Sequence, residues 1–209
     1  MLKLIWSRQQ VQMMTYHFNK TSLFIILSCL LLGTACNRIH APKPIGYFRL
    51  DLPEKEYVEL NGNYPFSCLI PQYAQVLIVP DTVSTADWYN LQMDDFKATI
   101  YLSYHQMLLP LGQYIEDARK MAYNHMQKAS AINYSVVMKP EKKVYGLYID
   151  IEGNDVATPF QFYLTDSVNN FLRGALYFDH VPNNDSVAPI IKFIKDDIDV
   201  FVESFQWKE

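Results

Sequence analysis

Ala98-Thr-Ile-Tyr-Leu-Ser-Tyr104 is the clearest strand pattern in this 209-residue sequence. Its apolar residues stand at alternate positions, namely Ala98, Ile100, Leu102 and Tyr104. Side chains of a strand alternate between its two faces, so one face of this segment is expected to lie on a core. The segment therefore predicts a half-buried strand around which the other elements can be arranged.

Further short strands are expected on both sides of this segment. They are predicted at residues 47–51, 56–60, 66–70, 75–79 and 88–93 before it, and at 144–151, 160–165 and 171–178 after it. The last two flank Ser167-Val-Asn-Asn170, a sequence typical of a turn. They are therefore expected to pair as a hairpin.

Two amphipathic helices interrupt the strands. Apolar residues recur at helical spacing over about eighteen residues from Leu111. A second helix is expected to begin at the cap Asn184-Asp-Ser, with Pro189 in its first turn. We expect its stripe of Ile191, Ile194, Ile198 and Phe201 to be core. The pattern predicts an α+β fold, with two amphipathic helices packed on an antiparallel β-sheet in a single domain.

The amino-terminal segment is typical of a lipoprotein signal peptide. After Lys20, an apolar run of about twelve residues is too short to span a membrane, which takes roughly 20. It ends at the small residues Gly33-Thr-Ala35 before Cys36. We predict a signal peptide at 1–35, a lipid anchor such as palmitate on Cys36, a tether at 36–44 and a single globular domain at 45–209.

Some alternatives for this segment stay open. Gly33 stands where the lipobox usually has Leu, and Cys29 is a rival, although it lies inside the apolar run. An uncleaved anchor helix is a further possibility. A start at Met13 or Met14 instead of Met1 would give the ordinary signal length.

Charge and motifs exclude several classes of function. Residues 1–35 hold three of the 18 basic residues and no acidic one, which leaves 15 basic and 22 acidic residues in the mature part. An acidic chain has no electrostatic footprint for nucleic acid. No hydrolase, zinc-protease, phosphate-loop or redox motif occurs. We therefore predict no catalytic residue, no metal ligand, no cofactor and no enzymatic activity.

Several polar residues have an ordinary structural explanation. Ser103 and His105 are expected on an outward strand face, and His125 at a core boundary. The segment Asp150–Asp155 only loosely matches a calcium loop and is read as a solvated turn. The pairs Asp94-Asp95 and Asp196-Asp197 are expected on the surface, and Cys68 is expected to be a buried, inert thiol. None of these residues predicts a site.

Arg173 is the most suggestive polar residue, because it shares a strand face with Ala175 and Tyr177. It can pair with a carboxylate such as Asp166 or Asp51, or stack on a ring. One hypothesis is that Arg173 holds the hairpin together. The other makes Arg173, Asp166 and Asp185 contacts for a partner protein.

Several long motifs resemble the gliding-motility lipoprotein family GldD of Bacteroidetes. They are Lys43-Pro-x-Gly-Tyr-Phe-Arg-Leu-Asp-Leu-Pro53, Ala98–Tyr104, Val144-Tyr-Gly, Gln161-Phe-x-Leu-Thr-Asp-Ser167, Phe171-Leu-Arg-Gly-Ala-Leu-Tyr-Phe178, Pro182-Asn-x-Asp-Ser and Phe205-x-Trp207. They stand in order from the Cys36 region to the carboxyl end. Cys36 matches the lipid-bearing cysteine of the family.

The resemblance implies an envelope lipoprotein required for gliding, working with other gliding and type IX secretion components, without known catalytic residues. We expect a non-catalytic assembly or scaffold protein. The alternative is a periplasmic ligand-binding or cryptic enzymatic domain that uses an aromatic sheet face. Residues 37–41 lack the acidic residues expected of surface-exported lipoproteins, so the domain is expected to face the periplasm. Either membrane could hold the anchor. By analogy, small modules of the Mog1 and PsbP type have a similar layered fold.

Overall fold

The computed structural model describes residues 51–80 and 86–208, which form a single α+β domain. Its strands are β1 (Tyr57–Glu59), β2 (Phe66–Ser67), β3 (Leu69–Pro71), β4 (Gln75–Val79), β5 (Ala86–Met93), β6 (Ala98–Gln106), β7 (Ala131–Lys139), β8 (Val144–Glu152), β9 (Phe160–Thr165), β10 (Asn170–Phe178) and β11 (Gln206–Trp207). Its helices are α2 (Leu111–Tyr123) and α3 (Asn184–Ser204), with 3-10 turns η1 (Asp94–Phe96), η2 (Met126–Lys128) and η3 (Pro140–Lys142). The predictions at residues 1–50, Cys36 among them, lie outside the described residues.

A seven-stranded sheet is the centre of the domain, in the order β4-β5-β6-β10-β9-β8-β7. All neighbouring strands in it are antiparallel. The strand predicted at residues 98–104 is β6, an interior strand between β5 and β10. The predicted hairpin is β9–β10, with Ser167 in its turn at a φ of 71°. The predicted α+β class with an antiparallel sheet is confirmed.

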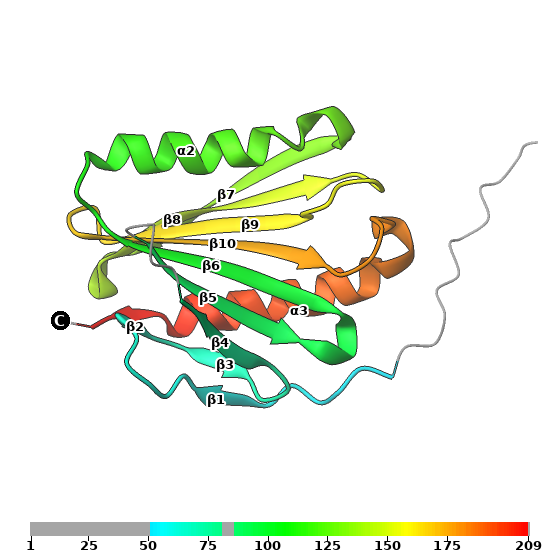
Figure 1. Ribbon diagram of the computed structural model, residues 1–209, viewed down its shortest axis with the longest axis horizontal. Coiled ribbons are helices and arrows are strands. Elements are labelled where there is room, and N and C mark those ends of the chain that lie inside the picture. Colours follow the sequence, from blue (N-terminus) through cyan, green and yellow to red (C-terminus); the bar gives the residue numbers. More distant parts are fainter. Residues whose placement is uncertain (1–50, 81–85, 209) are drawn as a thin grey trace, which may run out of the picture. The chain divides into compact units, whose positions relative to one another are not determined.

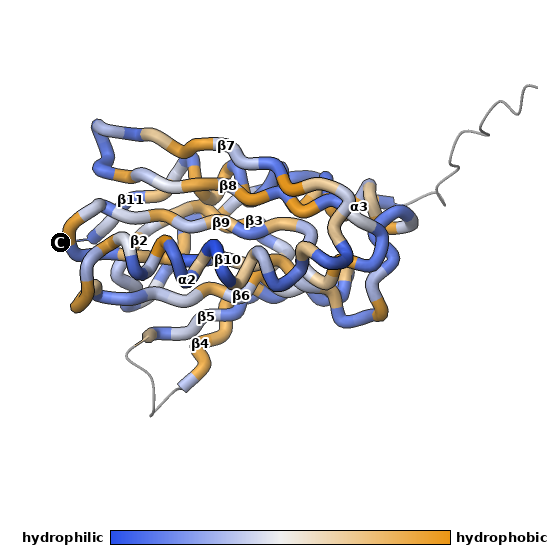
Figure 2. Tube along the Cα trace, turned by 90° about the horizontal axis from the view of Figure 1, so that it is seen from above, coloured by the Kyte–Doolittle hydropathy of each residue, from blue (hydrophilic) through white to orange (hydrophobic). Residues whose placement is uncertain are grey.

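The two helices cover opposite faces of this sheet. Phe171 and Leu172 are adjacent on β10 and, because strand side chains alternate, point to opposite faces. Phe171 lies in the cluster that contains Ala118 of α2, and Leu172 lies in the cluster that contains Ile194 of α3. Figure 1 shows α2 above the sheet and α3 beneath it, and in Figure 2 α2 runs over the middle of the sheet.

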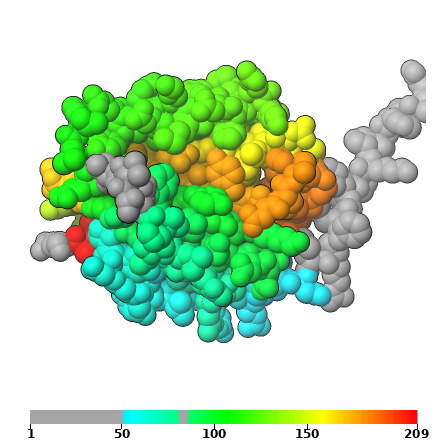
Figure 3. Space-filling model, in the orientation of Figure 1, coloured from blue at the N-terminus to red at the C-terminus, as the bar shows by residue number. Residues whose placement is uncertain are grey.

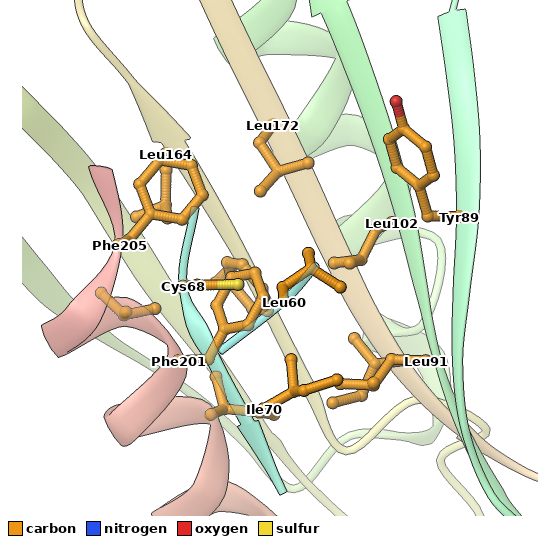
Figure 4. Close-up of a cluster of buried hydrophobic side chains, with 14 of the residues drawn as sticks. Leu60, Cys68, Ile70, Tyr89, Leu91, Leu102, Leu164, Leu172, Phe201 and Phe205 are labelled. Carbon is orange, nitrogen blue, oxygen red and sulfur yellow. The ribbon is translucent and has the colours of Figure 1, made fainter. Parts of the chain in front are cut away.

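The larger core lies on the α3 side. Figure 4 shows Leu102, Leu164 and Leu172 of the sheet facing Phe201 and Phe205 at the end of the chain. The predicted helix stripe is confirmed as core, with exposed fractions of 8% for Ile191, 0% for Ile194, 2% for Ile198 and 3% for Phe201. Each such side chain contributes roughly 1.5–3 kcal/mol on burial. The α3 stripe is therefore a main source of stability.

Two small ladders close this core. β1 pairs with β3, and β2 pairs with β11. Cys68 lies between β2 and β3 and is buried, as predicted. Burial raises the pKa of its thiol to about 12, so the reactive thiolate is scarce at neutral pH.

Gly174 of β10 fits a close approach within the core. A Cβ at this position would lie 2.3 Å from the ring of Phe162 on the neighbouring strand. The missing side chain leaves room for that ring, which explains the glycine in the middle of a buried strand.

One strand differs from the sequence-based prediction. No strand is predicted at residues 129–143, whereas the structure has β7 there, at the edge of the sheet. Most side chains of β7 are exposed, and Val137 alone within it is buried. Ile132, Tyr134, Val136 and Met138 alternate with Asn133 and Ser135, so the period-2 signal of a strand is present in the sequence and was overlooked.

The helix boundaries also differ from the prediction. The first helix ends at Tyr123, and only the 3-10 turn η2 continues it, so His125 lies beyond α2. The second helix begins at Asn184, which places Pro189 in its second turn rather than its first. The predicted cap is wrong, because the cap position is Asn183, which makes no side-chain cap hydrogen bond, and the side chain of Asn184, the first helical residue, does not cap the helix. It bonds a distant turn instead, as described below.

Candidate functional site

The three residues predicted as partner contacts lie in different parts of the domain. Asp166 closes the β9–β10 hairpin: its carboxylate accepts hydrogen bonds from the backbone N–H groups of Val168, Asn169 and Asn170. Burial opposes ionisation of Asp166, but these hydrogen bonds outweigh it and lower the pKa of the carboxyl. Asp166 therefore stabilises the turn, and it does not pair with Arg173.

Asp185 lies at the start of α3, beside the turn between β8 and β9. Its backbone N–H donates to Asn154 Oδ1 over 3.1 Å. The neighbouring Asn184 is buried and donates from Nδ2 to the carbonyls of Gly153 (2.8 Å) and Val156 (2.9 Å). This segment joins α3 to the turn and is separate from Arg173.

Arg173 lies on the α2 side of the sheet and has an incomplete set of partners. Its Nη2 donates to Gln161 Oε1 of β9 over 2.5 Å. Among residues 51–80 and 86–208, no carboxylate lies within ion-pair distance of Arg173. Loss of hydration lowers the pKa of the guanidinium, although Tyr177 acts in the opposite direction. The bond to Gln161 agrees with the hairpin hypothesis, yet most of the donors of Arg173 remain available.

Gln161 also has an unsatisfied group. Its side chain is 1% exposed, and its Nε2 has no acceptor in the described part of the chain. Buried donors without a partner are rare and carry a desolvation cost of about 1–3 kcal/mol. Arg173 and Gln161 together form a polar pair with unused donors on the α2 side of the sheet.

Aromatic side chains flank this pair on the strands that α2 leaves uncovered. Trp88 is 36% and Tyr101 40% exposed, and Tyr101 meets Tyr177 edge-on with ring centroids 5.6 Å apart. The strand register places Trp88 opposite Ser103, and Ser103 opposite Arg173. We call Trp88, Tyr101, Arg173 and Tyr177 the Arg173 face. In Figure 3, orange atoms of the β10 region show between α2 and the strands β5 and β6.

The nearby histidines are partly covered. Ser103 is 6% exposed, so the prediction of an outward polar position is wrong; on the neighbouring strands it stands opposite Trp88 and Arg173. His105 contacts the Tyr114 ring of α2, and burial lowers the pKa of its imidazole. Burial, then the charges of Arg173 and Lys128, also lower the pKa of His125. His125 is half-buried, as predicted.

An open hollow of about 640 Å³ lies on the other side, between α3 and the end of β8. The predicted solvated turn lines it, and so do Lys192 and Lys195. Its two lysines on α3 are paired: Lys195 Nζ lies 2.5 Å from Asp150 Oδ2, and Lys192 pairs with Asp196. Within the described residues, no group of three or more His, Cys, Asp or Glu side chains could hold a metal ion. Lys128 and Asp185 also line the hollow, and neither has an ion pair among the described residues.

Asp197 was predicted on the surface, and that prediction is wrong. It is 2% exposed and accepts hydrogen bonds from Lys55 Nζ (2.8 Å), Tyr57 Oη (2.7 Å) and Tyr73 Oη. Burial, and then the bond to Asp197, raise the pKa of both tyrosines. The sequence contains a sign of this burial, because Asp197 stands three residues after Ile194 and so lies on the same side of the helix as the core stripe. This cluster ties the segments before β1 and after β3 to α3.

These features define a class: a single α+β domain with an antiparallel sheet between two helices. No described helix is both long and apolar enough to cross a membrane. The solution structure of cyanobacterial PsbP from Synechocystis sp. PCC 6803 is similar over 79% of this chain and 99% of that one, with a TM-score of 0.47 and 10% identity. No curated protein matches.

A family model places the chain more narrowly. The model described as gliding motility lipoprotein GldD matches residues 37–207. The chain therefore belongs to the GldD family, as its motifs predict, and is a lipid-anchored protein of the cell envelope.

Proposed function

We propose that this lipoprotein is a non-catalytic assembly component of the gliding and type IX secretion machinery, required for motility, and that it holds a partner protein on the Arg173 face. Membership of the family supports the motility role. The chemistry of the Arg173 face supports the partner role. A lipid on Cys36 would keep the domain beside the membrane in which such a machine stands.

The observation that carries the proposal is the incomplete pairing of Arg173. A guanidinium without a carboxylate, beside exposed aromatic rings, resembles the composition of protein-binding surfaces, in which Arg, Tyr and Trp are enriched. A carboxylate of a partner could accept two parallel hydrogen bonds from Arg173. The hollow beside α3 gives less support to a ligand or enzyme role, because the two α3 lysines that line it are already paired with carboxylates.

The test is a pull-down from cross-linked envelope, in which wild type is compared with Arg173→Ala and Cys36→Ala. We expect Arg173→Ala to lose a specific partner while its melting temperature and its abundance in the envelope stay close to wild type. Lys192→Ala is the control, since it removes a cation on the α3 side and should retain the partner. If Arg173→Ala unfolds, Arg173 acts as the clamp of the hairpin and the partner role loses its support.

The proposal also includes a periplasmic orientation, because residues 37–41 lack the acidic residues expected of exported lipoproteins. Protease added to intact cells should leave the domain whole, and permeabilised cells should lose it. Rapid cleavage on intact cells would show that the domain faces outward.

A further inference from the structure

A second surface lies at the opposite margin of the sheet, away from the strands of the Arg173 face. β7 is the edge strand on this side and pairs with β8 alone in the sheet. Figure 2 shows it along one margin of the domain. Edge strands present unpaired backbone N–H and C=O groups, which can template another strand.

The side chains of β7 suit strand addition. Tyr134, Val136 and Met138 alternate on the α2 side and are 44%, 70% and 67% exposed. Asn133 and Ser135, on the other side, are exposed as well. Residues 131–138 contain no proline, no glycine and no charged residue, the usual features that protect an edge from pairing. The other edge strand, β4, is shorter and is followed directly by Pro80.

Charge around β7 indicates what kind of strand would fit. Residues 111–143 carry six basic and three acidic residues, a net charge of +3, whereas the rest of the described chain carries six basic and 17 acidic residues, a net of −11. Lys128 precedes β7, and Lys142 and Lys143 follow it. Among the described residues, no carboxylate lies within ion-pair distance of these three amines. At the carboxyl end Lys139 pairs with Glu203 and Lys142 donates to the Glu203 carbonyl, but Lys128 at one end and Lys143 at the other remain to meet an acidic group.

We propose that β7 is a docking edge for an extended segment of another protein, apolar at alternate positions in its middle and acidic at its ends. A second copy fits poorly, because pairing β7 with itself would bring the basic ends together. The segment 37–50 of this chain fits poorly too, since it carries Arg38, Lys43 and Arg49 and no acidic residue. A lipid surface offers no strand to complete the backbone hydrogen bonds. This surface goes beyond the proposed function and does not involve Arg173.

The test is hydrogen exchange of the full chain in detergent, with the capped peptide Asp-Glu-Val-Thr-Val-Thr-Val-Glu-Asp as the probe. We expect the peptide to slow exchange in residues 131–139 and not in β4. An analogue with lysines in place of its acidic residues should bind at least about tenfold more weakly, a difference of about 1.4 kcal/mol. Equal binding of both peptides, or no protection of β7, would overturn the proposal.

Two matched substitutions locate the effect. Val136→Asp should abolish the protection, whereas Val168→Asp, at an equally exposed valine (70%) in the β9–β10 turn, should leave it unchanged. Met138→Asp serves as a second edge variant, and thermal melts show which variants are folded. Protection of β7 without peptide that grows with protein concentration would mean that a second copy occupies the edge. Protection by phosphatidylglycerol vesicles and not by peptide would mean a lipid surface. Either result would overturn the proposal.

Discussion

Asp196 and Asp197 are neighbours on α3 with opposite surroundings. The side chain of Asp197 is 2% exposed and receives three hydrogen bonds, whereas that of Asp196 is 47% exposed and pairs with Lys192 at the surface. Lys55 also lies 4.2 Å above the Phe193 ring, so its amine is held by both the carboxylate and the ring. The two aspartates should therefore contribute differently to the free energy of unfolding.

Asp197→Ala is expected to destabilise the domain by about 3–5 kcal/mol, because it removes the acceptor of two tyrosine hydroxyls and the nearest carboxylate of the Lys55 amine, which keeps only the Phe193 carbonyl and the more distant Asp196. For a domain of this size, the lower figure corresponds to a fall in melting temperature of about 6–12 °C. Asp196→Ala is the matched control and should cost less than about 1 kcal/mol. Equal melting temperatures for the two variants, measured by circular dichroism, would contradict the structural role of Asp197.

At the scale of elements, α3 and α2 contribute unequally to the domain. α3 buries Ile194, Ile198, Phe201 and Val202 in the largest core cluster, whereas the buried residues of α2 are Ala118 and Ala122. Small side chains let α2 lie close to the sheet but remove less apolar surface from water. We expect α3 to dominate the stability of the domain.

Ile194→Ala on α3 should cost about 2–5 kcal/mol, since the side chain is fully buried and its removal leaves a cavity. Its effect on motility should follow from loss of folded protein, seen as lower abundance on an immunoblot of the envelope. Lys192→Ala, on the exposed side of the same helix, should change stability by less than about 0.5 kcal/mol. A variant at Ile194 that melts like wild type and still fails in motility would make the stripe an interface.

At the scale of the whole molecule, the anchor determines where the domain acts. We predict that Cys36 is the first residue of the mature protein and carries the lipid, because the apolar run ends at small residues directly before it. Mass spectrometry of the mature amino terminus should detect an acylated Cys36, and Cys36→Ala should leave the protein unprocessed. A mature protein that retains Leu23–Leu32 would contradict this prediction.

The stability of the whole domain should also depend on pH. Burial lowers the pKa of His105 and His125, so both bind a proton less readily in the folded than in the unfolded chain. Their contribution is complete above the unfolded pKa of about 6.5 and is lost as pH falls through the lower folded values. The melting temperature should therefore drop between about pH 7.5 and 5.5. Substituting both histidines with Asn should reduce this drop in melting temperature, whereas His180→Asn, at an exposed position, should not. An unchanged drop in the double variant would contradict the role of His105 and His125.

Local pattern determined much of this protein. The alternation in residues 98–104 and the turn at Ser167–Asn170 predicted β6 and the β9–β10 hairpin, because side-chain period and turn chemistry are written in neighbouring residues. The stripe on α3 predicted its core residues for the same reason. The family followed from long motifs in order along the chain.

Tertiary structure alone decided the rest. Which helix covers which face of the sheet depends on contacts such as those of Phe171 and Leu172 with different helices. The place of β7 at the edge of the sheet, with most of its side chains exposed, depends on the strand order. The burial of Asp197 and the incomplete pairing of Arg173 depend on partners distant in sequence, such as Lys55 and Gln161. Pairing and exposure are properties of neighbours in space, and a linear pattern records them only where the neighbours are also close along the chain.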